Sequence, residues 1–355
     1  MNGTMKTQDK PYVRRAHHAG SWYTDNTNAL HSVLEDFLLQ AQPMEPTPAI
    51  AQSNTTNDVY DIPKSIIAPH AGFSYSGPTA AYAYWGLREA LEKRSSGSPG
   101  AGVRTVLVLH PSHHVYLDGC AISGASLLET PVGNLPVDDE LRKELMDTGY
   151  FTIMSKEDDE KEHSGEMQYP FIAKVYHDAI RSQKKNSSSS NSLRNAPLLQ
   201  ALPIMVGGLS QRKEEHFGQI LAPILARPDI FCVVSSDFCH WGERFGYTPT
   251  PSPTDSPQTI HSYIHILDRI GMDHIAMQEP GAFAKYLKKF KNTICGRHPI
   301  SVWMHGIKQN KEKGLESVNI AFVKYAQSSA VKHTWESSVS YASAIARVEK
   351  QTANP

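Results

Sequence analysis

Short, β-branched apolar runs alternate with helical patterns along this chain, and this alternation restricts its possible folds more than any other feature. The runs are SIIAPHAG (65–72), TVLVLHPSHH (105–114), LPIMVGG (202–208) and FCVVSSDFCHW (231–241). Helical patterns occupy 26–41, 138–147, 211–227 and 281–291. Continuous apolar runs are typical of strands buried on both faces, and their alternation with helices indicates strand–helix–strand units. We therefore predict an α/β fold: a single domain with a central, mixed, mostly parallel sheet between helices.

The remaining segments complete this outline. NIAFVKYAQ (319–327) alternates like a further strand, and SSVSYASA (337–344) predicts an edge strand. Four segments rich in Ser, Pro, Gly and Asn lack the apolar area to offset the entropy of ordering: 42–60, 94–102, 182–197 and 247–258. Strand patterns lie on both sides of each, so we interpret them as surface loop insertions in one domain. Domain linkers are the less favoured alternative.

Charge and apolar content exclude several classes of partner. With 355 residues the chain can bury a large core without disulfides or a structural metal. Its formal net charge of -1 gives no reason to expect nucleic acid or an anionic membrane. No apolar run is long enough to span a bilayer, and the polar first residues lack the core of a signal peptide. Four scattered cysteines then indicate reduced thiols. We predict a soluble cytoplasmic protein, with the nucleus as a second location.

Titratable side chains stand where three of the apolar runs end. The first run ends at His70, the second at His110, His113 and His114, and the fourth at Asp237 and His240. In open α/β sheets, ligands bind beyond the carboxyl ends of the strands. We therefore expect imidazoles and a carboxylate to converge at one rim of the sheet.

Each of these histidines also has a structural interpretation. Considered by itself, His70 is more often interpreted as a hydrogen-bonded structural residue, although the small residues after it allow a ligand to approach. We favour His113 as a ligand in HPSHH, with His114 as a further contact and His110 as a structural or supporting residue.

Asp237 and His240 are three residues apart in SSDFCHW. If the turn is helical, this spacing places both on one face. A carboxylate beside an imidazole orients the ring and prepares it for proton transfer. The equally weighted alternative is a polar turn that caps the next segment.

Cys295 lies in TICGRHPI, where Pro299 suits the first turn of a following helix. A helix N-terminus and the nearby Arg297 both favour a thiolate, the form that binds metals or attacks carbon. Gly296 allows close approach of a ligand to the backbone. The local sequence leaves three interpretations open: a metal ligand, a nucleophile or a buried thiol.

Several motifs, taken in order, resemble the Memo family of cell-motility mediators. They are HAGSWY (18–23), IIAPHAG (66–72), PSHHV (111–115), EHSGEM (162–167), VVSSDFCHWG (233–242), NTICGRHPI (292–300), YAQSS (325–329) and SSVSYA (337–342). The resemblance covers a domain at about 14–345 and leaves 1–13 and 346–355 as flexible tails. It implies a fold similar to class III extradiol dioxygenases, the non-haem iron enzymes that open catechol rings.

The same resemblance implies roles for individual residues. The implied metal ligands are His70, His113 and Cys295. The residues implied to act catalytically in the same pocket are Asp237 and His240, with His240 in the place of a general base. The residues expected to contact substrate are Trp22, at the pocket mouth, and His114. We interpret Glu162, His163 and Glu166 as structural.

The chain also departs from the family pattern. His110 stands where the family commonly has glycine, which changes the surroundings of the ligands. Gln168 stands where histidine is frequent, which predicts the loss of a polar contact. The insertions at 182–197 and 247–258 are not family features.

Two imidazoles and a thiolate differ from the usual two-histidine, one-carboxylate iron site, so iron, copper and zinc all stay chemically feasible. The resemblance implies a redox metal; we expect iron first, copper close behind and zinc last. The favoured function is a metal-dependent oxidoreductase that reduces dioxygen to superoxide, and the missing carboxylate ligand argues against catechol ring cleavage. The alternative is a non-catalytic module that binds phosphotyrosine peptides or handles metal in cytoskeletal signalling. A zinc hydrolase is a third possibility.

Overall fold

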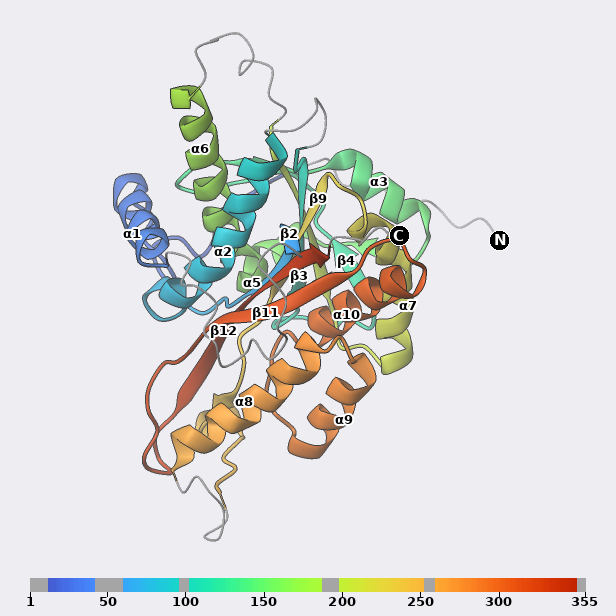
Figure 1. Cartoon of the computed structure of the whole chain (residues 1–355). Coiled ribbons are helices and arrows are strands. Elements are labelled where there is room, and N and C mark those ends of the chain that lie inside the picture. Colours follow the sequence, from blue (N-terminus) through green and yellow to red (C-terminus); the bar gives the residue numbers. More distant parts are fainter. Residues whose placement is uncertain (1–11, 42–59, 96–101, 187–197, 252–258, 350–355) are drawn as a thin grey trace.

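The structure is a computed structural model that describes residues 12–41, 60–95, 102–186, 198–251 and 259–349 (Figure 1). The first and last residues of the chain, and most of the four predicted polar insertions, lie outside the described residues. None of the described helices combines the length and the apolar composition that crossing a membrane requires.

A mixed sheet occupies the centre of the described chain, and its four middle strands are parallel. In spatial order they are β2 (Tyr60–Ala68), β9 (Ile230–Ser235), β3 (Thr105–Pro111) and β8 (Gln200–Val206). Because parallel strands share a direction, the loops that leave β2, β3 and β9 all start from one edge of the sheet.

Antiparallel pairings extend this core on both sides, which confirms a mixed sheet. Beyond β2 lie β12 (Ser338–Glu349), β11 (Val318–Gln327) and β10 (His240–Trp241), and both of the latter pair with β12. Beyond β8 lie β4 (Cys120–Ile122), which is antiparallel to β8, and β7 (Phe151–Ile153), which is parallel to β4. A separate small sheet, which the sequence did not predict, contains β1 (Tyr12–Arg14), β5 (Ala125–Leu128) and β6 (Leu135–Pro136).

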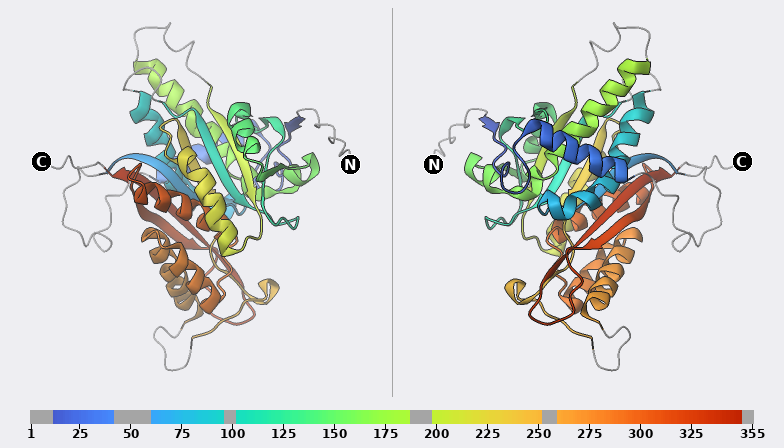
Figure 2. Two further views of the ribbon diagram at one scale, coloured as in Figure 1. Left: turned by 90° about the vertical axis from the view of Figure 1, so that its right-hand side faces the viewer. Right: turned by 90° about the vertical axis from the view of Figure 1, so that its left-hand side faces the viewer.

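Helices cover both faces of the sheet (Figure 2). One face carries α1 (Thr27–Gln40), α2 (Phe73–Ser95) and α6 (Tyr169–Asn186), and the other carries α7 (Gln211–Leu225) and α10 (Arg297–Glu312). The shorter helices are α3 (Asp139–Asp147), α4 (Lys156–Lys161), α5 (His163–Glu166) and the 3₁₀ turn η1 (Glu243–Phe245). A pair formed by α8 (Ile260–Ala276) and α9 (Pro280–Phe290) packs beside β11 and α10.

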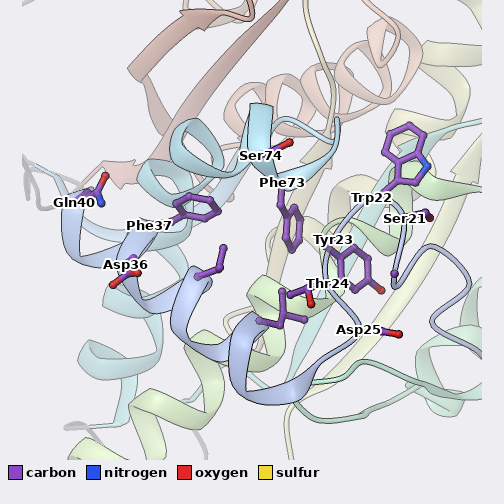
Figure 3. A pocket seen from close by; sticks show the side chains of 13 residues that line it. Ser21, Trp22, Tyr23, Thr24, Asp25, Asp36, Phe37, Gln40, Phe73 and Ser74 are labelled. Atoms are coloured by element: carbon purple, nitrogen blue, oxygen red, sulfur yellow. The ribbon is translucent and has the colours of Figure 1, made fainter.

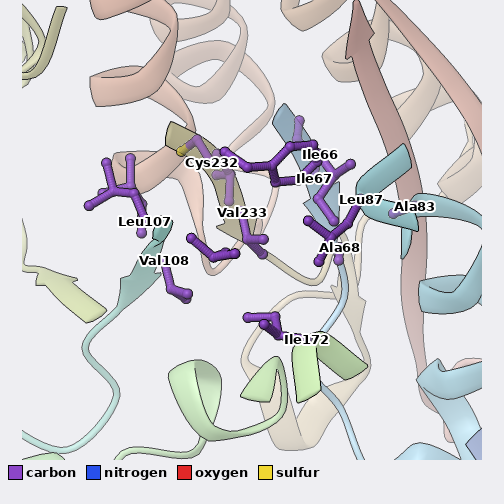
Figure 4. Packing of buried hydrophobic residues seen from close by; sticks show 14 of the residues in the cluster. Ile66, Ile67, Ala68, Ala83, Leu87, Leu107, Val108, Ile172, Cys232 and Val233 are labelled. Atoms are coloured by element: carbon purple, nitrogen blue, oxygen red, sulfur yellow. The ribbon is translucent and has the colours of Figure 1, made fainter. Parts of the chain in front are cut away.

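The core explains why the middle strands read as continuous apolar runs. Val108 of β3 aligns with Val233 of β9, which aligns with Ile66 of β2, and all three are essentially fully buried. Leu87 of α2 and Ile172 of α6 close the layer from one side (Figure 4). Strands covered on both faces need apolar residues at every position rather than at alternate ones.

The predicted elements match the structure within a few residues for all four buried runs, for 319–327 and for the helices at 26–41, 138–147, 211–227 and 281–291. The edge-strand prediction for 337–344 was wrong, because β12 is paired on both sides, with β2 and β11. Residues 12–13 and 346–349, predicted as tails, lie in β1 and β12. The long helix α2 was missed, since Gly77 and Pro78 in its first turns resemble a loop.

Candidate metal centre

Four loops bring the candidate residues together at the carboxyl edge of the parallel strands. His70 stands two residues after β2, His113 two residues after β3 and Asp237 two residues after β9. Cys295 directly precedes Gly296, the N-cap of α10. The similar offsets follow from the aligned ends of β2, β9 and β3, so the expected convergence at one rim is present in the structure.

Cys295 lies in direct contact with His70, one of the two histidines implied as its partners. Its Sγ is 3.1 Å from Nε2 of His70. The backbone N–H of Asp237 donates to the same sulfur over 3.3 Å. The rings of His70 and His113 meet edge to face, with centroids 5.3 Å apart. Burial raises the pKa of the Cys295 thiol, and the nearby His113 opposes that shift.

His163 also belongs to this cluster, although we had interpreted it as structural. Nitrogen atoms of His70, His113 and His163 all lie within 4.8 Å of one another. The His163 ring stacks on His113, with centroids 4.5 Å apart and planes at 26°. It comes from the four-residue helix α5 rather than from a strand end. The search for titratable residues at strand ends therefore could not identify His163. Burial, followed by the charge on His113, lowers the pKa of His163 to about 3.

A chain of hydrogen bonds fixes the tautomer of His70. Gln168 Nε2 donates to Ser235 Oγ over 2.8 Å, and Ser235 Oγ donates to the carbonyl of Ser164 over 2.8 Å. The only remaining role for Ser235 toward His70 Nδ1, at 2.8 Å, is that of acceptor. His70 therefore carries its proton on Nδ1, and the lone pair on Nε2 faces Cys295. This is the support that metal-binding histidines usually have.

Gln168 contradicts the expectation that it removes a polar contact. Besides Ser235, its amide nitrogen donates to the Pro69 carbonyl over 3.1 Å, and its oxygen accepts from Tyr84 over 2.8 Å. An amide of this length spans the gap between α6 and the ends of β2 and β9. The side chain is fully buried and hydrogen-bonded at both ends.

Glu162 orients His113 in the same way. One carboxylate oxygen accepts from His113 Nδ1 over 2.8 Å, and the other accepts from its backbone N–H over 2.6 Å. His113 Nε2 is thus the nitrogen left to face the cluster. Burial disfavours the imidazolium, but the nearby Cys295 and the hydrogen bond with Glu162 outweigh burial and raise the pKa of His113 to about 10. The hydrogen bond from His113 overcomes burial and lowers the pKa of Glu162.

Asp237 and His240 do not share a helical turn, so that basis for pairing them was wrong. Residues 236–239 belong to neither a helix nor a strand, and His240 begins β10. Asp237 is buried, and its Oδ1 accepts from the backbone N–H of His70 over 2.8 Å. Burial raises the pKa of Asp237, and the charge on His240 opposes the rise.

The ring of His240 is held by carbonyl groups. Its Nδ1 lies 2.9 Å from the Phe238 carbonyl and 3.0 Å from the Thr293 carbonyl. Carbonyls only accept, so Nδ1 carries a proton and Nε2 is free to accept one. This arrangement suits a general base.

Trp22 and His114 lie at the rim, where contact with a substrate was expected. Trp22 is 36% exposed, and its ring stacks on His163 with centroids 4.2 Å apart. His114 is exposed and meets the His163 ring edge-on at 6.0 Å. Trp22 also borders a cavity of about 720 Å³ between the 20–25 loop, α1 and the start of α2 (Figure 3). The histidines lie outside this cavity, so Trp22 separates the two.

Glu166 anchors the segment that carries Trp22. Its carboxylate accepts from Arg14 Nη1 over 2.7 Å, from the backbone N–H of His18 over 2.8 Å and from Tyr23 Oη over 2.8 Å. Burial would raise the pKa of Glu166, but His18 and Arg14 lower it to about 2. The structural interpretation of Glu166 thus agrees with its contacts.

His110 is buried in β3 as a structural residue. Its Nδ1 faces Ser164 Oγ at 3.1 Å, which links β3 to the helix that carries His163. Burial lowers its pKa.

Gly296 is required by packing and not, as we expected, by ligand approach. A Cβ at this position would lie 2.5 Å from the carbonyl oxygen of Ser235 and 2.4 Å from Cβ of Ser236. The absence of a side chain lets the turn before α10 press against the end of β9. This packing contact places Cys295 next to His70.

Comparison with known proteins places this arrangement in a wider context. A family model described as Memo-like protein matches residues 14–345. Protein MEMO1 of zebrafish (Danio rerio) and that of human are each 39% identical over 329 residues, covering 93% of this chain and 95% of each relative. Protein memo-1 homolog of Caenorhabditis elegans is 37% identical over 334 residues, covering 94% of this chain and 82% of that protein. The matched region includes every loop that contributes to the cluster.

Proposed function

The chain belongs to the Memo-like protein family, and we propose that it is a metal-binding redox protein in which His70, His113 and Cys295 hold an iron or copper ion. The observation that carries this proposal is the contact of Cys295 Sγ with Nε2 of His70 at 3.1 Å, beside the ring of His113, whose centroid lies 5.3 Å from that of His70. The three residues come from distant segments, and acceptors on Nδ1 leave both histidines with Nε2 facing inward.

His163 is the competing third donor, and ring geometry argues against it. A nitrogen lone pair lies in the plane of its ring, so two stacked and nearly parallel rings direct their lone pairs side by side. His163 and His113 are stacked in this way, with planes at 26°. They cannot both aim at one nearby ion without rotating. His70 and His113 are inclined at 76°, which allows convergence.

The donor set fits a first-row transition metal. Imidazole nitrogens suit iron, copper and zinc alike, and a thiolate favours the softer members of the group. We propose iron first and copper next, with zinc less favoured because it would supply only Lewis-acid chemistry. When bound, iron or copper would supply one-electron exchange with dioxygen.

The surrounding residues fit roles in binding and proton transfer. His240 can accept a proton at Nε2, and buried Asp237 balances the charge that this proton brings. Trp22 and His163 cover the ligands on one side. The proposed net reaction passes one electron from a reduced donor to dioxygen and yields superoxide. Catechol ring cleavage is not proposed, because the donor set has no carboxylate ligand.

Metal content and oxygen consumption test this function. The protein is purified anaerobically, its iron, copper and zinc are quantified, and the measurement is repeated with Cys295→Ser and His70→Ala. Near-stoichiometric redox metal in the wild type and its loss in both variants are expected, with oxygen consumption above that of the free metal. A wild type that binds none of the three metals would overturn the proposal.

The four unpaired cysteines favour a location of the protein in the reducing cytoplasm.

A non-catalytic binding module is the second candidate, supported by the exposed Trp22 and the cavity beside it. In that case a phosphotyrosine peptide, or another protein segment, would contact Trp22 and His114. Metal that binds without oxygen consumption beyond the free ion, together with saturable binding of a phosphotyrosine peptide, would favour this alternative.

A further inference from the structure

Asp268 of α8 is a fully buried carboxylate outside the histidine cluster. Its Oδ1 accepts from the backbone N–H of Cys239 over 3.2 Å and from Nδ2 of Asn292 over 2.9 Å. Its Oδ2 accepts from Tyr325 Oη over 2.9 Å. Within the described chain these donors are neutral, and no ion pair involves Asp268. A buried carboxylate without a cation is costly unless hydrogen bonds compensate it, and these three donors supply that compensation.

The two donors to Oδ1 come from the two loops that build half of the cluster. Cys239 lies between Asp237 and His240, and Asn292 lies three residues before Cys295. A single oxygen atom of Asp268 therefore connects both loops to the same point on α8.

Thr293 joins these loops to each other. Its Oγ1 accepts from the backbone N–H of His240 over 2.7 Å and donates to the His240 carbonyl over 2.9 Å. The Thr293 carbonyl in turn accepts from the His240 ring. The loops thus form one hydrogen-bonded unit, and the bonds to Asp268 fix that unit to a long helix.

We propose that Asp268 is a positioning residue, which holds Cys295 and the Asp237–His240 pair in register with the histidines that follow β2 and β3. This inference rests on the proposed metal site. We infer that the acceptor atom Oδ1 of Asp268, and not its negative charge, holds the two loops in place. Loss of outer partners typically weakens metal binding, because the ligands lose their fixed orientation.

The chain offers a variant that separates the acceptor from the charge. Asp268→Asn keeps an oxygen for Cys239 and Asn292, and its amide N–H can donate to Tyr325. Tyr325 can then turn its own proton toward Ser340 Oγ, which lies 3.1 Å away. Asp268→Ala removes the acceptor altogether and leaves two buried donors unpaired.

Asp138 provides a matched control. It is also buried, and it accepts from a backbone N–H, that of Leu141, and from a hydroxyl, that of Thr105. Thr105 is the first residue of β3, so this carboxylate lies at the opposite end of the strand from His113. Asp138→Ala should cost stability without moving the cluster.

Two readouts test the proposal on the full-length protein: Co²⁺ titration, followed through the thiolate-to-metal absorption band, and the alkylation rate of Cys295 in metal-free protein. Asp268→Ala should weaken Co²⁺ binding about ten- to a hundredfold and speed alkylation. Asp268→Asn should restore both values, and Asp138→Ala should change neither. Wild-type values in Asp268→Ala, or an Asp268→Asn variant as impaired as Asp268→Ala, would overturn the assignment.

Failure of the metal site itself is distinguishable. If wild-type protein takes up no Co²⁺, the alkylation rates alone decide the role of Asp268, and the iron, copper and zinc content of the purified protein decides the proposed function. If Asp268→Ala does not fold, Asn292→Ala removes the bond between Asp268 and the Cys295 loop, together with the bond from Asn292 to Tyr286 Oη, and leaves the bond to Cys239 in place. That variant should bind Co²⁺ more weakly and be alkylated faster, and unchanged values would again contradict the proposal.

Discussion

The Sγ of Cys295 lies 3.1 Å from Nε2 of His70, although 225 positions separate the two residues. The contact joins the end of β2 to the turn before α10. It depends on Gly296, which lets that turn press against β9, and on Ser235, which holds the proton of His70 on the opposite nitrogen. Gly296 and Ser235 therefore keep the thiol of Cys295 and the imidazole of His70 facing each other.

Replacement of Glu162 by Gln should weaken metal binding about ten- to a hundredfold. Both carboxylate oxygens accept from His113, and an amide can serve only one of these two donors. Competition titrations with Fe²⁺ under anaerobic conditions would measure the change. Glu157→Gln, on the exposed side of α4, is the control and should bind like wild type. Equal affinity in the Glu162 and Glu157 variants would show that His113 does not need this support.

Trp22 should report metal binding through its fluorescence. Its ring stacks on His163, which stacks on His113, so a paramagnetic ion at the cluster should quench it strongly. The chain has five tryptophans, and Trp22→Phe should remove most of the quenching that Cu²⁺ or Co²⁺ causes. Trp335→Phe, at a position that is 75% exposed, should leave the quenching unchanged. Undiminished quenching in Trp22→Phe would place the bound ion elsewhere.

Glu166→Gln should destabilise the fold by about 1.5–3 kcal/mol, because hydrogen bonds to a buried charge are lost while Asp159 still pairs with Arg14. The carboxylate is fully buried against Arg14 and anchors the segment that carries Trp22. Urea unfolding would measure the loss. Glu140→Gln breaks an exposed pair with Arg104 and should cost about 1 kcal/mol or less. Similar small losses in both variants would mean that Glu166 is not an anchor.

Asp268 should make stability depend on pH in the acidic range. Burial raises its pKa from 3.8 to about 6, so the folded state binds a proton that the unfolded state releases. The resulting stabilisation is fully present below pH 3.8 and is lost as the pH rises through 6. Wild type should therefore lose about 2 kcal/mol relative to Asp268→Asn between pH 4.5 and 7.5. Urea unfolding of wild type and Asp268→Asn at pH 4.5 and pH 7.5 measures this loss. A difference in unfolding free energy between the two proteins that is the same at both pH values would contradict the pKa shift.

The fold was largely predictable because its middle strands are covered on both faces. Val108, Val233 and Ile66 are buried on strands with helices on both faces, so their neighbours in the sequence are apolar as well. Because these strands are parallel, the polar residues that follow them lie at one edge of the sheet. His163 could not be found in this way, because it reaches the cluster from α5. The Asp268 network was also invisible, since α8 carries this carboxylate on its buried, otherwise apolar face. Long-range hydrogen bonds of this kind leave no periodic pattern in a sequence.

X-ray absorption of the iron- or copper-loaded protein tests the central claim most directly, because it distinguishes sulfur from nitrogen around the metal. The predicted result is one sulfur neighbour, which disappears in Cys295→Ser and persists in His163→Ala. A shell of nitrogen and oxygen only, unchanged by Cys295→Ser and altered by His163→Ala, would contradict the account and make the three histidines the ligands.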